Sequence, residues 1–126
     1  MTEQAFEIMR GEIYWVSLDP IVGREAGGGK IRPVAVLSIN DINLKPLVVT
    51  VIPGTSVKPL KRPNFRNSAI VLPTKANGLD VETVFECHQL RAIDKSRFTS
   101  RRVGALAPLD LERIENAARF SLGLLG

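Results

Sequence analysis

The short apolar run at residues 33–38, Pro-Val-Ala-Val-Leu-Ser, decides the fold class of this chain. Runs of this length in which β-branched residues dominate are buried strands more often than helices. Residues 47–52, Leu-Val-Val-Thr-Val-Ile, repeat the signal. Pro53 and Gly54 are expected to end that second strand, because proline cannot donate to the hydrogen-bond ladder. This part of the sequence therefore predicts two buried strands of a β-sheet.

The rest of the chain extends this pattern and ends differently. Further strands are predicted at residues 11–18, 68–72 and 83–93. Pro108 suits the first position of a helix, where its missing N–H would be unpaired anyway. Apolar residues then recur at three- and four-residue spacing, at Leu111, Ile114, Ala118 and Leu122. About five strands followed by one amphipathic helix indicate a small barrel or curled sheet capped by a helix.

Length and composition set the limits of the interpretation. The chain has 126 residues, and we expect a flexible leader over residues 1–9 and a single domain over 10–126. The leader is polar and acidic, unlike a signal peptide, and no apolar run approaches the roughly 20 residues of a membrane helix. Cys87 is the only cysteine and His88 the only histidine, which argues against a disulfide or a zinc site. We therefore expect a cytoplasmic protein without metal, cofactor or membrane contact.

The charges are unevenly placed along the chain. Between Asp41 and Asp80 there is no acidic residue, whereas six cations occur there: Lys45, Lys58, Lys61, Arg62, Arg66 and Lys75. A segment of one sign attracts polyanions, although a solvated lysine-rich loop is the alternative interpretation. Within it, residues 58–66 carry two prolines, so we expect a mobile tether rather than a strand.

Five segments occur in order along nearly the whole chain. They are Gly11–Val16 with Leu18-Asp19-Pro20 and Gly23-Arg24-Glu25; Arg32–Ser38; Pro53-Gly54-Thr55-Ser56; His88-Gln89-Leu90-Arg91 with Asp94-Lys95; and Gly104-Ala105-Leu106. Together they resemble the MazF/PemK toxin family. The sequence departs from that pattern at residues 27–31, Gly-Gly-Gly-Lys-Ile, which lengthen the gap before the Arg-Pro pair. Glycines of this kind favour a mobile loop.

The resemblance implies a small SH3-like barrel of the CcdB/MazF type and an endoribonuclease that cleaves single-stranded RNA without a metal. In that reaction the 2′-hydroxyl attacks its own phosphate and leaves a 2′,3′-cyclic phosphate and a 5′-hydroxyl. The reaction needs no outside nucleophile. It does need preorganised donors aimed at the charge that develops on the phosphate.

Arg32 and Thr55 are the catalytic candidates that the resemblance implies. The planar guanidinium of arginine can hold two phosphate oxygens and stays charged, and Pro33 keeps the backbone of Arg32 extended. Thr55 would hydrogen-bond the same phosphate. The alternatives are a solvated arginine at a strand end and an ordinary turn threonine after Pro-Gly.

The other candidates are expected to bind RNA. Glu25 could accept a hydrogen bond from a base edge or help to move a proton, unless it is an exposed loop carboxylate. His88 could be a general base, although a lone histidine on a strand is more often merely hydrogen-bonded. The RNA-binding candidates are Glu25, Lys30, Ser56, Lys58, Lys61, Arg62, His88 and Gln89.

The resemblance also implies partners and leaves alternatives open. It implies a homodimer with RNA in a groove near the subunit interface, and a cognate antitoxin whose acidic, partly disordered tail blocks that groove. One alternative is a CcdB-like poison of DNA gyrase with the same fold, and another is an SH3-like module that binds RNA without cutting it. The pair of Arg32 and Thr55 favours the nuclease, because a gyrase poison is not expected to need it.

Overall fold

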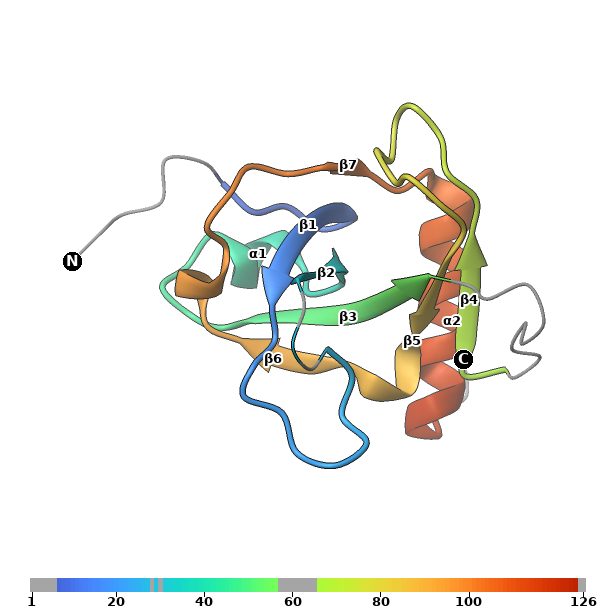
Figure 1. Ribbon diagram of the computed structural model, residues 1–126, viewed down its shortest axis with the longest axis horizontal. Coiled ribbons are helices and arrows are strands. Elements are labelled where there is room, and N and C mark those ends of the chain that lie inside the picture. The colour runs from blue at the N-terminus through green and yellow to red at the C-terminus, as the bar shows by residue number, and fades with distance from the viewer. Residues whose placement is uncertain (1–6, 28, 30, 57–65, 125–126) are drawn as a thin grey trace.

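The computed structural model describes residues 7–27, 29, 31–56 and 66–124 of the chain (Figure 1). The elements, in chain order, are β1 (Glu12–Ser17), β2 (Ile31–Val36), α1 (Asn40–Asn43), β3 (Val49–Ser56), β4 (Ser68–Val71), β5 (Thr83–Glu86), the 3-10 turn η1 (Cys87–Gln89), β6 (Arg91–Ile93), the 3-10 turn η2 (Lys95–Arg97), β7 (Gly104–Ala105) and α2 (Pro108–Leu122). The prediction of a mainly β chain with a C-terminal helix is confirmed.

The strands form one curled sheet with β3 at its centre. Its order is β4-β5-β3-β2-β1-β7, and β6 also pairs with β3. All the strand pairs are antiparallel. On one side β3 changes partner, because its ladder with β6 ends at Val51 and its ladder with β5 begins at Gly54. The helix α2 packs against β4 and η1 at the β4 end of the sheet (Figure 1).

The predicted end of the strand over residues 47–52 at Pro53 is wrong. β3 continues through Pro53 and Gly54 to Ser56. Pro53 is tolerated because it lies between the ladders of β6 and β5, where no bond from its missing N–H is needed on that side. Gly54 is needed because a Cβ there would lie 2.7 Å from Cγ2 of Thr83 and 3.0 Å from Cε1 of Phe85. Close packing, not a turn, explains this Pro-Gly pair.

The single strand predicted over residues 83–93 is also wrong. The turn η1 divides it into β5 and β6. Cys87 begins this turn and is fully buried, and its N–H donates to the carbonyl of Asn67 at 2.9 Å. A buried residue at this point imitates the apolar spacing of a strand. As a consequence His88 and Gln89 lie on a turn beside α2 rather than on a strand.

Two apolar clusters cover the two faces of the sheet. One includes buried residues of α2, such as Ile114, together with Ile52 and Phe85 of the sheet. The other lies on the opposite face and includes Val34, Val36, Val49, Val51 and Ile93. The alternation of side chains along each strand separates the two sets. No helix in the described part of the chain is both long and apolar enough to cross a bilayer.

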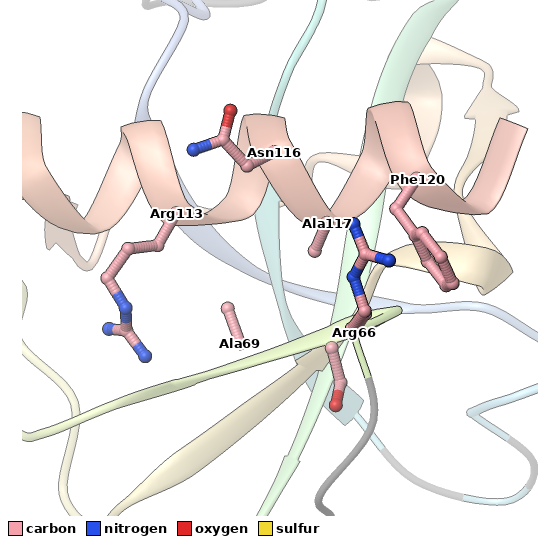
Figure 2. Close-up of a pocket in the computed structure, with 7 residues that line it drawn as sticks. Arg66, Ala69, Arg113, Asn116, Ala117 and Phe120 are labelled. Carbon is pink, nitrogen blue, oxygen red and sulfur yellow. The ribbon is translucent and has the colours of Figure 1, made fainter. Parts of the chain in front are cut away.

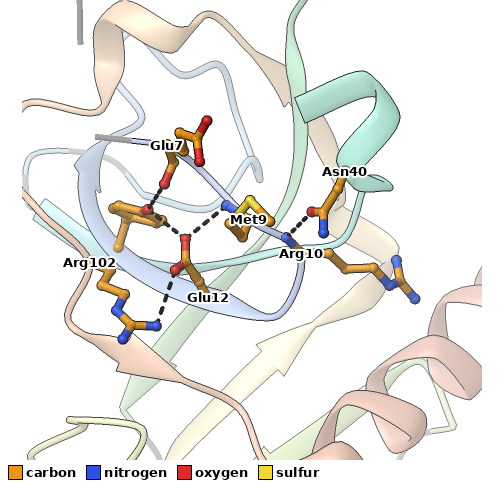
Figure 3. A network of polar contacts seen from close by, with 7 residues as sticks. Glu7, Met9, Arg10, Glu12, Asn40 and Arg102 are labelled. Carbon is orange, nitrogen blue, oxygen red and sulfur yellow. Dashed lines mark hydrogen bonds and ion pairs between the residues drawn. The ribbon is translucent and has the colours of Figure 1, made fainter. Parts of the chain in front are cut away.

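The segment before β1 is bound to the second cluster. Ile8 is 2% exposed and belongs to that cluster. The nearly buried carboxylate of Glu12 accepts hydrogen bonds from the N–H of Met9 at 2.8 Å and the hydroxyl of Tyr14 at 2.7 Å (Figure 3). Arg102 forms an ion pair with the same carboxylate at 3.2 Å. The packed part of the chain thus begins before residue 10.

Candidate functional site

Arg32 and Thr55 lie opposite each other on neighbouring strands. β2 and β3 pair antiparallel with Val34 opposite Pro53. Continuing that register toward the start of β2 brings Arg32 opposite Thr55. Their side chains meet, because Nη1 of Arg32 donates a hydrogen bond to Oγ1 of Thr55 at 2.9 Å. The structure therefore brings together the two residues that were predicted to be catalytic.

The pair stands at the end of an apolar row on the sheet face that turns away from α2. Side chains alternate along a strand, so Arg32 shares a face with Val34, and Thr55 shares a face with Val51. Both valines are fully buried in the second cluster. Arg32 and Thr55 are only partly buried. The apolar row ends in a cation and a hydroxyl where the sheet reaches solvent.

The arrangement of these two side chains leaves donor groups without a partner among the described residues. Arg32 is the donor in the bond to Thr55, so the proton of the threonine hydroxyl remains free to be donated elsewhere. Nε of Arg32 is buried and has no hydrogen-bond partner among the described residues. An unpaired buried donor is costly, and a charged fork beside a hydroxyl donor suits the oxygens of a phosphate.

Ser56 and Glu25 do not join this pair in the structure. Ser56 is exposed and, being the next residue after Thr55 in β3, projects from the other face of the strand. Glu25 is also exposed, and its Oε1 accepts a hydrogen bond of 2.6 Å from the N–H of Val22. The carboxylate of Glu25 therefore closes a turn within its own loop.

Gln89 and His88 make contacts within the protein. The amide of Gln89 donates to the carbonyl of Arg24 at 2.9 Å and accepts from the N–H of Ala26 at 3.1 Å. His88 is exposed, and its Nδ1 lies 3.1 Å from Nδ2 of Asn67. The side chain of Gln89 thus holds the backbone of the loop between β1 and β2, and the ring of His88 contacts Asn67.

Four predicted RNA-binding residues, Lys30, Lys58, Lys61 and Arg62, lie outside the described residues. Most of the basic segment 58–66 lies outside them too, but its last residue, Arg66, is described. It is exposed, and its guanidinium carbon lies 4.2 Å from the centroid of the Phe120 ring. This is the geometry of a cation–π contact.

Sequence reasoning missed the residues that fix the loop between β1 and β2. Nη1 of Arg91 donates to the carbonyl of Leu18 at 3.2 Å, and Nη1 of Arg97 donates to the carbonyl of Asp19 at 2.6 Å. The Asp19 carboxylate accepts from the N–H of Gly29 at 3.1 Å. Arg91 and Asp19 belong to the motifs that carried the resemblance. Nothing local in the sequence shows that Arg91 contacts the loop or that Asp19 binds its other end.

Neither Cys87 nor a metal-binding cluster adds chemistry in the described residues. Burial raises the pKa of the Cys87 thiol to about 12, so it stays protonated at neutral pH and is a poor nucleophile. The described part of the chain has no group of three or more histidine, cysteine, aspartate or glutamate side chains placed to hold a metal ion.

A separate shallow pocket of about 280 Å³ lies between β4 and α2 (Figure 2). Arg66, Arg113 and Phe120 line it over a floor that includes Ala69 and Ala117. It contains neither of the predicted catalytic residues.

Comparison with known proteins gives one family for almost the whole chain. Residues 9–122 match the family of PemK-like, MazF-like toxins of type II toxin–antitoxin systems. The endoribonuclease EndoA of Bacillus subtilis is 29% identical over 120 residues, which cover 94% of this chain and 97% of that protein.

Solved structures show the same fold. MazF from Deinococcus radiodurans superposes with a TM-score of 0.75 at 21% identity, over 94% of this chain and 98% of that one. A mycobacterial endoribonuclease in complex with its cognate antitoxin gives a TM-score of 0.73 at 18% identity, with the same coverage of 94% and 98%. Since the family match spans residues 9–122, this chain belongs to the PemK-like, MazF-like toxins of type II toxin–antitoxin systems.

Proposed function

We propose that this toxin cleaves single-stranded RNA by attack of a 2′-hydroxyl on the adjacent phosphate, with Arg32 and Thr55 binding that phosphate. The class of endoribonuclease follows from the family and from the 29% identity to the endoribonuclease EndoA. The cleavage chemistry is supported by one observation above all, the hydrogen bond of 2.9 Å that places the Arg32 guanidinium beside the Thr55 hydroxyl.

The proposed step balances without an outside reactant. The bond from the 2′-oxygen to phosphorus forms while the bond from phosphorus to the 5′-oxygen breaks. The 2′-hydroxyl loses its proton and the departing 5′-oxygen gains one, so the products carry a 2′,3′-cyclic phosphate and a 5′-hydroxyl. The substrate supplies the nucleophile, and the metal independence that we propose rests on this. Arg32 and the hydroxyl proton of Thr55 would stabilise the negative charge on the phosphate.

Strand binding is assigned to other residues of the chain. Glu25 is proposed to accept a hydrogen bond from a base edge of the RNA, for which it would have to leave the N–H of Val22 that it now binds. His88, which is exposed on the turn η1, is proposed to hydrogen-bond the RNA strand. Lys30, Lys58, Lys61, Arg62 and Ser56 are proposed to bind the strand.

The proposed partners are a cognate antitoxin and a second copy of the chain, in the cytoplasm. Solved relatives of the same fold include a complex of MazE with MazF from Deinococcus radiodurans, with a TM-score of 0.70. Exposed apolar side chains at the end of the chain, Phe120, Leu122 and Leu124, support a homodimer. Sedimentation of a monomer at micromolar concentration would contradict that assembly.

Incubation with labelled single-stranded RNA in excess chelator tests the proposed activity. Fragments are expected if the chain is a metal-independent nuclease. A shift of the RNA without fragments would mean a binding module. The absence of both fragments and a shift would favour a poison of DNA gyrase. A strict requirement for a divalent metal would contradict the proposed chemistry.

A further inference from the structure

We infer that Gln89 is a positioning residue that holds the β1–β2 loop at Arg24 and Ala26 and thereby places Glu25 for RNA. The inference rests on the proposed function, because it assigns Gln89 a role in binding the strand that Arg32 and Thr55 would cleave. Gln89 would act through the loop backbone rather than through its own contact with RNA.

The contacts of Gln89 fall on both sides of Glu25. Nε2 of Gln89 donates to the carbonyl of Arg24 at 2.9 Å, and Oε1 accepts from the N–H of Ala26 at 3.1 Å. A carboxamide has a donor and an acceptor side by side, so it pairs with this stretch of backbone as a neighbouring strand would. The bonded residues are 65 and 63 positions away in the sequence. The position of the β1–β2 loop is therefore fixed by an element that is distant in the sequence.

That element is anchored in the core. Gln89 ends the turn η1, which packs against α2. On one side of it Cys87 is fully buried, and on the other Leu90 packs against the same cluster. Gln89 itself is partly buried. A side chain on a turn that is packed in the core loses little further conformational freedom when it binds a loop. Gln89 therefore fixes the loop relative to the core.

Further contacts hold the loop at Leu18, Asp19 and Gly29. Arg91 and Arg97 bind the carbonyls of Leu18 and Asp19, and the Asp19 carboxylate binds the N–H of Gly29. These contacts fix where the loop leaves β1 and where it returns toward β2. Gln89 adds a fixed point in the middle, next to Glu25. Loss of Gln89 should therefore free the loop around Glu25 while the base of the loop and Arg32 stay in place.

Hydrogen exchange of the Ala26 amide in the free protein tests the clamp itself. Gln89→Ala should accelerate this exchange by about 5-fold or more, because the amide loses its acceptor. Asn116→Ala is the matched control, since it removes an exposed carboxamide from α2, and it should leave the exchange unchanged. Unchanged exchange in Gln89→Ala would overturn the clamp.

Kinetics on single-stranded RNA test whether the clamp matters for binding. Gln89→Ala should raise KM about 5-fold or more and change kcat less than about 3-fold, since the loop binds RNA and Arg32 is undisturbed. A faster Ala26 exchange with an unchanged KM would overturn the positioning role. If the wild-type chain cleaves no RNA, the proposed function fails, and the exchange measurement still decides whether Gln89 holds the loop.

Gln89→Glu gives a signature that a merely structural role would not give. At neutral pH the carboxylate would face the carbonyl of Arg24 without a proton to donate. As the pH falls and this carboxylate is protonated, it regains one donor and one acceptor. Ala26 exchange and KM, each relative to the wild type at the same pH, should therefore return toward wild-type values as the pH is lowered to about 5. A defect that does not depend on pH would contradict the donor role of Gln89.

Discussion

Nη1 of Arg32 and Oγ1 of Thr55 are joined by a hydrogen bond of 2.9 Å, although 23 positions separate the two residues in the sequence. The antiparallel register of β2 and β3 sets this meeting. A rigid sheet therefore positions both groups, which is what electrostatic stabilisation of a developing charge requires.

The losses in cleavage rate caused by Arg32→Ala and Thr55→Ala should not multiply when the two substitutions are combined. Thr55→Ala should reduce the cleavage rate at saturating RNA, and Arg32→Ala should reduce it more. Because the hydrogen bond orients both groups on one phosphate, Arg32→Ala with Thr55→Ala should lose little more than Arg32→Ala alone. Single-turnover kinetics measure this, with Ser100→Ala as the control, because it removes an exposed hydroxyl to which no role is assigned. Fully multiplicative losses would mean that the two residues act separately.

Gly54→Ala should destabilise the protein by closing the space between β3 and β5. The new Cβ would lie 2.7 Å from Cγ2 of Thr83 and 3.0 Å from Cε1 of Phe85, and overpacking of this kind costs about 1–3 kcal/mol. Urea unfolding measures the loss in free energy of unfolding.

Thr83→Ser provides the control for that substitution. It removes Cγ2 and keeps the hydroxyl, which donates to the carbonyl of Val81 at 3.0 Å. Combined with Gly54→Ala it should recover part of the stability lost. If Gly54→Ala unfolds like the wild type, the close packing of β3 on β5 is not what requires glycine.

Stability should fall in alkali because of two buried groups whose neutral forms the fold favours. Burial raises the pKa of Cys87 from 9.0 to about 12. Burial and the carboxylate of Glu12 likewise raise the pKa of Tyr14. A raised pKa in the folded state means that the unfolded chain loses its protons first. The stability is therefore complete below about pH 9 and is lost as the pH rises through the folded values.

Urea unfolding between about pH 8 and pH 11 measures this loss. Ionisation of one thiol in the unfolded chain contributes up to about 1.4 kcal/mol per pH unit. Cys87→Ala should flatten the part of the decline that begins near pH 9, and Tyr14→Phe should flatten the part that begins near pH 10. A decline of the same slope in Cys87→Ala would contradict the contribution of the thiol.

The basic segment should attract RNA rather than do chemistry. Each phosphate neutralised on a single strand contributes about 0.7 to the slope of log affinity against log salt. Replacement of Lys58, Lys61 and Arg62 together by alanine should flatten that slope by up to about 2 and leave the saturated cleavage rate nearly unchanged. A triple alanine variant of three exposed cations outside the one-sign segment, Arg101, Arg113 and Arg119, is the control. An unaltered slope in the first variant would mean that this segment does not touch the RNA.

Much of the fold could be predicted because it depends on local patterns. The apolar runs near Val34 and Val51 and the stripe through Ile114 each specify an element by their spacing. The division of the strand at Cys87 could not be predicted, because a buried residue on a 3-10 turn keeps the apolar spacing of a strand. The passage of β3 through Pro53 depends on where two other strands end, which no local signal gives.

The candidate site was also predictable only in part. Motifs indicated Arg32 and Thr55, but only the register of two strands shows that they meet. Gln89 was predicted to bind RNA, and in the structure its amide binds the backbone on both sides of Glu25. The partners of that amide lie more than 60 positions away, so the sequence could indicate the residue and not its contacts.

The central claim is that Arg32 binds a phosphate that is attacked by its own 2′-hydroxyl. The most direct test measures single-turnover cleavage, in excess chelator, of one RNA and of its copy with a deoxyribose at the cut position, by the wild type and by Arg32→Ala. The wild type should cut only the ribose substrate and leave a 2′,3′-cyclic phosphate, and Arg32→Ala should cut it about 10²–10³ times more slowly while remaining folded. Cleavage of the deoxyribose substrate, or a near-normal rate in Arg32→Ala, would contradict the account.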